Sequence, residues 1–378
     1  MATRTWFALF LSISPLLAQL RPGDPTSVGI SRVALDRVNA LLESEVHQGL
    51  GAASILIARQ GTIVLHKGFG HLSPEPGSPK VEPDSVYIVA SITKPVTATA
   101  LMMLVERGKV SLADPVSTYL PEFTGGEKNK VRVLDLLAHT SGMPDMLPEN
   151  TELRRAHAPL SEFVKHSYTT PLLFTPGTAF RYQSMGILLA AEIVAKLSGM
   201  PLREFERKEI FEPLGMQHSA LGLGGMRIAD TVRVQDSGEA SWNSNSEYWR
   251  NMGHPWGGMH TTTLDLSILL QTFLNGGASS GKRILSPLTV KAMTANQNAH
   301  LNAPWGLGWA LGRSTAWNEF GDLVSPAAFG HAGASGTVEW ADPETQLICV
   351  ILTNRPLAVD GGRFLRLVSN AVAASIEK

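Results

Sequence analysis

The spacing of apolar residues changes along the chain, and each change predicts a different kind of structure. Residues 33–46 carry apolar side chains at helical spacing, which predicts an amphipathic helix. Two apolar runs at 52–58 and 62–66 predict strands, joined by a tight turn because Gly61 can adopt a positive φ. A loop rich in proline and glycine at 72–83 then leads into a second, more apolar helix.

From residue 114 to about residue 298 the pattern is mainly helical, with proline and glycine at the breaks. The predicted helices in this part are 131–138, 160–166, 185–197, 202–210 and 264–274. Strand patterns return after residue 298, and a closing helix follows them. These strands are predicted at 305–311, 328–340 and 346–353, with a turn at Asp342-Pro343-Glu344 and the helix at 362–376.

Strands at both ends of the chain with helices between them predict an α+β fold. In this fold an antiparallel β-sheet flanked by helices is built from both chain ends, and a mainly helical subdomain is inserted between them. We assign residues 27–113 and 299–378 to the sheet domain and residues 114–298 to the helical subdomain. The active site is expected at their interface.

Residues 1–18 resemble a secretory signal peptide, with one positive charge, a short apolar stretch and the small residue Ala18 before a cleavage site. Leu16 departs from that pattern, since a small residue is expected there. The prediction is an exported protein, periplasmic or secreted; the alternative is an amphipathic or irregular N-terminus on a cytoplasmic protein. No other stretch approaches the ~20 apolar residues of a membrane span.

Composition excludes several classes of function. The 378 residues have a formal net charge of −1 and no run of like charges, so no nucleic-acid partner is predicted. The single cysteine, Cys349, lies in an apolar strand pattern, where thiol catalysis is not expected. His254 and His260 lack companion ligands at metal-binding spacing, so we predict neither a metal nor another cofactor.

Candidate chemistry begins at the start of the second apolar helix. Ser91 and Lys94 are three residues apart, and side chains at that spacing share a helix face. A lysine whose pKa is lowered by burial or by nearby cations can take the proton of the serine, and the helix N-terminus favours the alkoxide. Taken alone, the same pattern more often marks a capping serine beside a solvated lysine.

A second candidate group is Tyr182, on the irregular segment before the predicted helix at 185–197. Ser184 is a suitable N-cap for that helix. A tyrosine beside a cationic lysine would have a lowered pKa and could relay or accept the serine proton. Without the other motifs, a lone tyrosine is more often a packing residue with its hydroxyl at the surface.

The third candidate is Phe329-Gly-His-Ala-Gly-Ala-Ser-Gly-Thr337, a strand pattern with many small residues. Such residues weaken a strand and indicate that a ligand or another backbone approaches closely. One N–H from this strand and one from Ser91 would form an oxyanion hole. His331 is either a substrate contact or a structural histidine.

A competing nucleophile is Ser279, in Gly277-Ala-Ser-Ser-Gly281, which matches the nucleophile elbow Gly-x-Ser-x-Gly. That motif requires a strand before it and a helix after it. Here it follows the predicted helix 264–274 and leads into a polar loop, so we do not expect Ser279 to be the nucleophile. The Trp/Asn-rich stretch 241–256 either lines an acyl pocket or is a packed loop.

These three stretches resemble the serine β-lactamase and penicillin-recognising family, and are most similar to its class C-like branch, which includes the family VIII carboxylesterases. The family pattern is Ser-x-x-Lys, then Tyr-x-Asn, then Lys-Thr-Gly or His-x-Gly. The chain has Ser91-Ile-Thr-Lys94, Tyr182-Gln-Ser184 and His331-Ala-Gly333. The resemblance covers about residues 33–353, and other similar stretches are 136–143, 211–216, 257–262 and 281–286.

The resemblance implies a nucleophile, Ser91, activated by Lys94, with Tyr182 as general base and proton relay. It also implies an oxyanion hole from the backbone N–H groups of Ser91 and Ala334, next to Gly333. Two departures favour a neutral ester over a β-lactam. Ser184 replaces the asparagine that helps hold the lysine and the substrate amide, and His331 replaces the lysine that pairs with a substrate carboxylate.

We therefore predict a serine hydrolase that forms an acyl-enzyme. The expected reaction is that of a carboxylesterase on short or medium acyl esters, which leaves room for weak β-lactam hydrolysis. A β-lactamase or D-amino-acid peptidase is the first alternative, and a positive charge on His331 would favour it. A penicillin-binding protein that acylates but turns over slowly is the second. In each case the partner is a small-molecule ester or lactam.

Overall fold

The computed structural model describes residues 20–236, 238–314 and 319–377. The predicted signal segment, residues 1–18, lies outside the described residues. The main sheet has seven strands in the order β1-β3-β2-β12-β11-β10-β9. These strands are β1 Arg21–Pro22, β2 Ala52–Arg59, β3 Thr62–Gly70, β9 Ala310–Leu311, β10 Phe329–Gly333, β11 Thr337–Asp342 and β12 Leu347–Thr353.

Strands from the two chain ends meet in the middle of this sheet, which confirms the predicted α+β fold. Strand β2 pairs antiparallel with β12, and Ile57 lies opposite Cys349. All eight residues of β2 are buried, because helices cover both faces of the sheet, and six of them are apolar, with Ser54 and Arg59 as the exceptions. Only the two-residue edge strand β1 runs parallel to its neighbour, β3.

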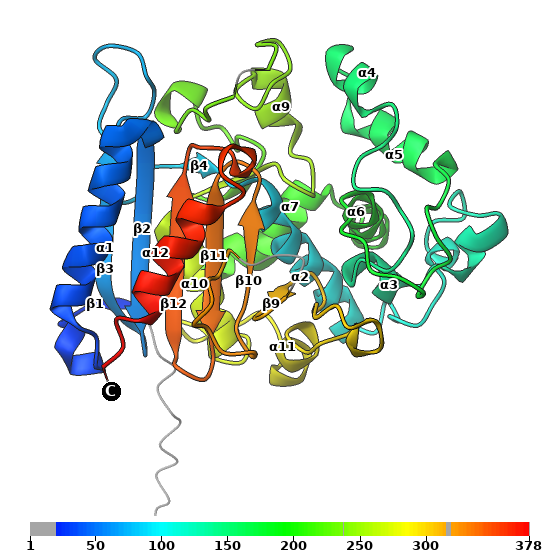
Figure 1. Cartoon of the computed structure of the whole chain (residues 1–378). Helices are drawn as coiled ribbons and strands as arrows, with labels where there is room; N and C mark the ends of the chain where they lie inside the picture. Colours follow the sequence, from blue (N-terminus) through cyan, green and yellow to red (C-terminus); the bar gives the residue numbers. More distant parts are fainter. Residues whose placement is uncertain (1–19, 237, 315–318, 378) are drawn as a thin grey trace, which may run out of the picture.

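Helices lie on both faces of the sheet (Figure 1). Helices α1 (Arg32–Glu45) and α12 (Arg363–Ala373) pack on one face, and the core there includes Leu42, Trp340 and Val368. Helices α2 (Thr93–Glu106) and α10 (Thr263–Leu274) pack on the opposite side, within a larger core that extends into the helical part of the chain.

The remaining helices are α3 Val133–Leu137, α4 Asn150–Arg155, α5 Leu160–Thr169, α6 Met185–Ser198, α7 Leu202–Glu206, α8 Glu212–Leu214, α9 Glu247–Met252 and α11 Pro287–Met293. Of these helices, α3 to α6 lie on the right of Figure 1, while α9 lies toward the top and α11 toward the bottom. Short strands form two further sheets: β4 Tyr87–Ile88, β6 Met259–Thr261 and β5 Ala220–Leu221 in one, and β7 Ala278–Ser279 with β8 Lys282–Arg283 in the other. Since α10 packs on the main sheet although it lies within 114–298, the proposed domain boundaries stay a prediction.

Two strand predictions need correction. The segment 305–311 keeps only the two-residue strand β9, because the N–H groups of Gly306 and Gly308 bond to Trp309 and Leu137 instead of continuing a ladder. The segment 328–340 is a hairpin of β10 and β11, and Gly336 turns the chain with a φ of 94°. The predicted turn after Asp342 does separate β11 from β12.

Helix α2 is buried over nearly its whole length. Every residue from Thr93 to Leu104 is buried, as expected for a helix that is apolar on all sides. Lys94 is one of these residues and is fully buried. The amine of Lys94 therefore lies in the protein interior, where the charged form costs free energy because it loses its hydration.

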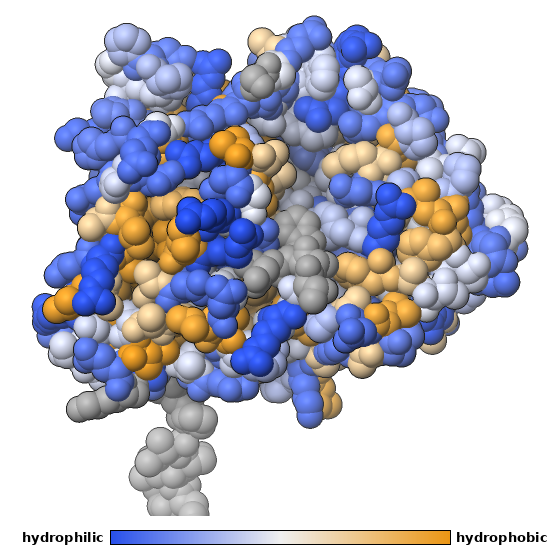
Figure 2. All heavy atoms as spheres, in the orientation of Figure 1, coloured by the Kyte–Doolittle hydropathy of each residue, from blue (hydrophilic) through white to orange (hydrophobic). Residues whose placement is uncertain are grey.

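Polar and apolar side chains are interspersed over the face of the molecule shown in Figure 2. Among the described residues, no single helix is long and apolar enough to cross a membrane, although α6 and the helical run Leu202–Leu214 pass that test together as a pair bent by 75°. Most residues of α6 are buried in the core of the protein.

Candidate active site

Ser91 lies in a single 3-10 turn, Ala90–Ile92, directly before α2. Ala90 has a φ of 46°, an uncommon conformation for a residue with a side chain, and it turns the chain sharply just before the serine. Val89 N–H donates to Met259 on β6, and Thr93 Oγ1 accepts from Met259 N–H. The turn that carries Ser91 is thus held by the small sheet.

The hairpin β10–β11 holds the same turn from the other side. Ser335 Oγ donates to Ile88 O at 2.8 Å, and Thr337 Oγ1 donates to Val89 O at 3.0 Å. A Cβ on Gly333 would lie 2.1 Å from Val89 O, so this position admits only glycine. This close approach of two backbones is what the small residues of the strand predicted.

Lys94 reaches from the first turn of α2 to the serine. Its Nζ lies 2.8 Å from Ser91 Oγ and donates to Trp256 O at 2.9 Å. Burial lowers the pKa of Lys94 to about 7, and the negative charge of Asp145 partly opposes this. Near neutral pH a large fraction of the amine is therefore uncharged, and its lone pair can accept the Ser91 proton.

Tyr182 completes the group, and its hydroxyl hydrogen-bonds Ser91. Its ring centroid lies 4.7 Å from Lys94 Nζ. We expected a cationic lysine to lower the pKa of Tyr182, and this expectation is wrong. Burial raises that pKa well above its ordinary value, and the bond to Ser91 offsets only part of the effect. The phenol is therefore neutral near pH 7.

Buried polar contacts fix the segment that carries Tyr182. Gln183 N–H donates to His139 Nδ1 at 3.3 Å, and the Gln183 side chain donates to Asp135 O and accepts from Ser141. His139 itself contacts the ring of Tyr182, with a centroid distance of 4.7 Å. Burial holds the pKa of His139 well below its usual range, so this imidazole is neutral.

Ser184 stands before α6 but makes no side-chain cap; its Oγ donates to Asp145 Oδ1 at 2.6 Å instead. Among the contacts of the described residues there is none between Ser184 and Lys94. The carboxylate of Asp145 instead influences both Lys94 and Tyr182 through its charge. Asp145, 39 positions before Ser184 in the sequence, is therefore linked to the site by its hydrogen bond with Ser184.

His331 lies on β10, fully buried, with Nδ1 2.7 Å from Ala332 O. Burial lowers the pKa of His331 to about 3, and the charge of Lys94 acts in the same direction. Its ring lies beside Tyr182 and Trp305, at centroid distances of 5.9 and 5.7 Å. At neutral pH it is an uncharged imidazole packed behind Tyr182.

A cavity of about 290 Å³ opens at Ser91 between the hairpin and the helical part of the chain. Ala334 lines the same cavity, consistent with a backbone N–H pair from Ser91 and Ala334. Part of the stretch 241–256 also lines it, as one of our two alternatives predicted. The lining residues are Ile88, Ala90, Ser91, Met146, Arg154, Val234, Asp236, Ser244, Trp249, His254, Trp256, Gly257, Ala334, Ser335 and Pro356.

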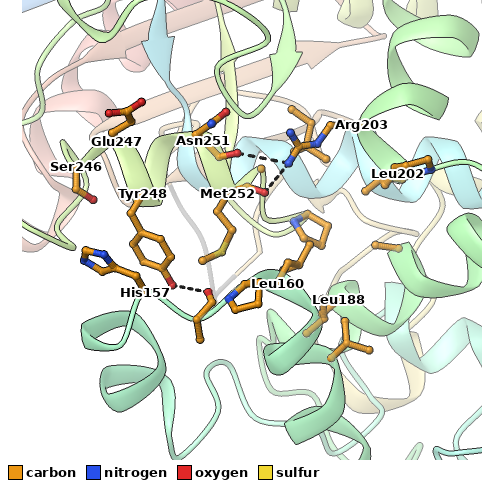
Figure 3. Close-up of a pocket in the computed structure, with 18 of the residues that line it drawn as sticks. His157, Leu160, Leu188, Leu202, Arg203, Ser246, Glu247, Tyr248, Asn251 and Met252 are labelled. Atoms are coloured by element: carbon orange, nitrogen blue, oxygen red, sulfur yellow. Dashed lines mark hydrogen bonds between the residues drawn. The ribbon is translucent and has the colours of Figure 1, made fainter.

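A larger cavity of about 930 Å³ lies elsewhere, between α5, α6, α7 and α9 (Figure 3). Its edge is closed by Arg203, which donates to Met252 O, and by Tyr248, whose hydroxyl donates to Ala158 O. None of Ser91, Lys94 and Tyr182 lines it. Pro255 lines this cavity and Trp256 lines the one at Ser91, so one short segment separates the two.

Ser279 lacks the context of a nucleophile elbow. It lies on β7, which turns back into β8 rather than into a helix. His260 Nδ1 lies 2.9 Å from Gly222 O, and His254 is buried between two tryptophan rings. Within the part of the chain that the structure describes, no three His, Cys, Asp or Glu side chains are grouped to hold a metal.

The structure therefore brings together Ser91, Lys94, Tyr182, Ala334 and Gly333, with His331 behind them and Ser184 turned toward Asp145. Sequence reasoning missed four contributors: Asp145, His139, Gln183 and Trp256. His139 and Gln183 do lie within stretches that carry the family resemblance. No local pattern marked Asp145 or the carbonyl of Trp256.

The structure places a serine hydroxyl beside a buried amine, where the main sheet meets the helical region. The family model described as Beta-lactamase matches residues 38–371, and the chain belongs to this family. The protein is a hydrolase with the β-lactamase fold.

Named relatives span most of the chain. A protein of Salmonella typhimurium named "Putative D-alanyl-D-alanine carboxypeptidase" is 28% identical, and the match covers 89% of this chain and 86% of that protein. A penicillin-binding protein homologue from Caulobacter crescentus is 23% identical, with a TM-score of 0.76 over 92% of this chain and 99% of its own. A family VIII carboxylesterase is 21% identical, with a TM-score of 0.72 over 91% and 99%. The last two similarities support the fold alone.

Proposed function

We propose that this protein is a serine hydrolase that works through an acyl-enzyme and chiefly hydrolyses carboxylic esters with short or medium acyl groups. The observation that carries the proposal is the contact between the buried amine of Lys94 and the partly exposed hydroxyl of Ser91, with Nζ and Oγ 2.8 Å apart. An amine with a pKa of about 7 is well matched to a proton transfer near neutral pH.

In the proposed reaction Ser91 Oγ attacks the ester carbonyl carbon and its proton passes to neutral Lys94. The backbone N–H groups of Ser91 and Ala334 stabilise the oxyanion that forms. When the bond to the alcohol breaks, the alkoxide takes the proton back from Lys94 through the neutral hydroxyl of Tyr182. Water then attacks the acyl-enzyme, and the same groups move its proton in the same order.

Two features favour an ester over a lactam or peptide. His331 is uncharged at neutral pH, whereas the alternative of a β-lactamase or D-amino-acid peptidase called for a positive charge there. Ser184 is engaged with Asp145, so its hydroxyl proton is not offered to a substrate amide. An ester needs neither contact.

The test compares initial rates on p-nitrophenyl butyrate, a chromogenic cephalosporin and a D-alanyl-D-alanine peptide. Wild-type protein should hydrolyse the ester fastest, Ser91→Ala should lose this activity, and Ser279→Ala should keep it. Activity that survives in Ser91→Ala would exclude this nucleophile. Faster turnover of the cephalosporin or the peptide would replace the ester assignment, and a stable mass adduct after exposure to a β-lactam would indicate a slow penicillin-binding protein.

A further inference from the structure

Arg154, on α4, is a cation that lines the Ser91 cavity and that the proposed reaction does not use. Lys94 titrates near neutral pH and its Nζ is held by Ser91 and Trp256. Among the described residues that line the cavity, Arg154 is therefore the lasting source of positive charge. It is partly buried, where an uncompensated charge is costly.

The guanidinium of Arg154 is held in place without a carboxylate partner. Its Nη2 donates to Trp242 O at 2.7 Å, and the rings of Trp249 and Trp242 lie 3.7 and 5.0 Å from its central carbon. Its Nε is buried with no hydrogen-bond partner, and no ion pair joins it to an acid of the described chain. A guanidinium presents N–H groups in a planar fork that can bind a carboxylate through two parallel hydrogen bonds.

Asp236 is the acid that lines the same cavity, and no ion pair joins it to Arg154 among the described residues. One of its oxygens accepts from Gly238 N–H and the other from Ser244 N–H, both at 2.8 Å. These backbone amides hold the carboxylate in place. The charges of Asp236 and Arg154 still influence one another, but without a direct contact.

Aromatic contacts connect Arg154 with the reacting groups. Trp249, on which Arg154 stacks, lies against His254 with a centroid distance of 4.1 Å, and His254 lies against Trp256 at 4.8 Å. Trp256 O in turn accepts from Lys94. Burial holds the pKa of His254 well below its usual range, and the charges of Arg154 and Lys94 act in the same direction. A small molecule in the 290 Å³ cavity can therefore contact Ser91 with one end and Arg154 with the other.

We propose that Arg154 is a specificity-determining residue, and that the preferred substrates are esters that also carry a free carboxylate. This inference rests on the proposed esterase function, and it replaces the neutral ester that the sequence favoured, because the carboxylate would bind Arg154 and not His331. The carboxylate lies on the acyl chain, as in a monoester of a dicarboxylic acid, or on the alcohol, as in an ester of a hydroxy acid. In both cases it binds the guanidinium N–H groups while the ester carbonyl lies at Ser91.

The experiment measures kcat/KM for two matched pairs of esters. One pair is p-nitrophenyl hexanoate and mono-p-nitrophenyl adipate, which differ in charge at the end of the acyl chain. The other is phenyl butyrate and 3-carboxyphenyl butyrate, which differ in charge on the alcohol. Wild-type protein should prefer the anionic member of at least one pair by about 10- to 100-fold, the worth of a charge-assisted hydrogen bond.

Three variants separate recognition from folding. Arg154→Met should lower kcat/KM for the preferred anionic ester by about 10- to 100-fold and for its neutral partner by less than about threefold. Arg154→Lys keeps the charge without the paired N–H groups and should lose about tenfold. Arg155→Met, at the exposed neighbouring position on the same helix, should change neither rate. Added salt should reduce the preference of the wild-type protein.

Two outcomes would overturn the inference while the proposed function stands: no preference for either anionic ester, or equal loss on charged and neutral esters in Arg154→Met. Failure of the proposed function looks different, because ester turnover would then persist in Ser91→Ala whatever the charge of the substrate. Circular dichroism and melting temperature of Arg154→Met, compared with Arg155→Met, identify a variant whose fold is damaged, and Arg154→Lys then provides the comparison.

Discussion

The proton-accepting role of Lys94 predicts how activity depends on pH. If neutral Lys94 accepts the Ser91 proton, kcat/KM for a neutral ester must follow the fraction of uncharged amine in the free enzyme. With a pKa of about 7, that fraction is about 1% at pH 5, half at pH 7 and about 99% at pH 9. We therefore expect kcat/KM to rise about 100-fold between pH 5 and pH 9, with its midpoint near pH 7.

The surroundings of Lys94 leave few other groups to explain such a curve. The pKa of His331 is lowered to about 3, and those of His139 and His254 lie well below the usual range because all three rings are buried. Near neutral pH these imidazoles are therefore uncharged. The neighbouring carboxylate that matters is Asp145, whose charge raises the pKa of Lys94.

A substitution at Asp145 tests the assignment directly. Asp145→Asn removes a negative charge that stabilises the ammonium form, so the midpoint should move to lower pH by several tenths of a unit. Asp230→Asn, at an exposed acid paired with Arg227, is the matched control and should leave the midpoint unchanged. Lys94→Arg stays protonated throughout and should lose 10²- to 10⁴-fold.

The assay is the initial rate on p-nitrophenyl butyrate, corrected for spontaneous hydrolysis, with a check that protein held at each pH recovers full activity at pH 8. A profile that is flat between pH 5 and pH 9 would refute the reasoning. So would a limb that stays in place when Asp145 is replaced, because the titrating group would then not be the amine beside it.

Three further substitutions test the relay, a buried acid and the larger cavity. Tyr182→Phe removes the relay but keeps the packing, so kcat for the ester should fall about 10²- to 10⁴-fold while the midpoint of the pH profile stays near 7; an unchanged kcat would exclude the relay. Glu206 is buried, and burial raises its pKa to about 8. Between about pH 4.5 and pH 8 the folded state therefore keeps a proton that the unfolded state has released. The free energy of unfolding should fall as the pH rises through this range. Glu206→Gln should remove this loss, up to ~3–5 kcal/mol, in urea melts at pH 5 and pH 8, whereas equal pH dependence in both proteins would contradict it. Ala195→Phe projects into the 930 Å³ cavity, which lacks the reacting groups, and should leave kcat/KM within about twofold, whereas a large loss would link that cavity to turnover.

The sequence patterns predicted the architecture because a strand that is buried on both faces is apolar at nearly every position, and this can be seen in the sequence alone. Strands β2 and β12 are apolar at nearly every position, and that is why the joining of the two chain ends could be predicted. The segment 305–311 was harder. Its tryptophans resemble strand residues, but the two glycines between them let the backbone bond to other parts of the chain.

Contacts between distant residues account for what the sequence did not predict at the site. The pairing of Ser184 with Asp145 joins positions 39 apart, and the bond between Lys94 and Trp256 O joins positions 162 apart. No periodicity or short motif encodes either one. The close approach of Gly333 to Val89 could be anticipated, because it has a local cause: a strand crowded with small residues.

The pKa of Tyr182 shows why a motif alone does not assign proton roles. A nearby lysine lowers the pKa of a phenol only if the amine is charged, and the same burial that surrounds Tyr182 also discourages the charge on Lys94. Burial therefore shifts the two pKa values in opposite directions, down for the amine and up for the phenol, and both shifts favour the neutral forms. A pair that rests neutral can move a proton without first losing a charge to solvent. Lys94 and Tyr182 therefore bring little permanent charge to the cavity. A charged substrate must be recognised by a residue other than these two, and Arg154, which lines the cavity, is the residue that we propose.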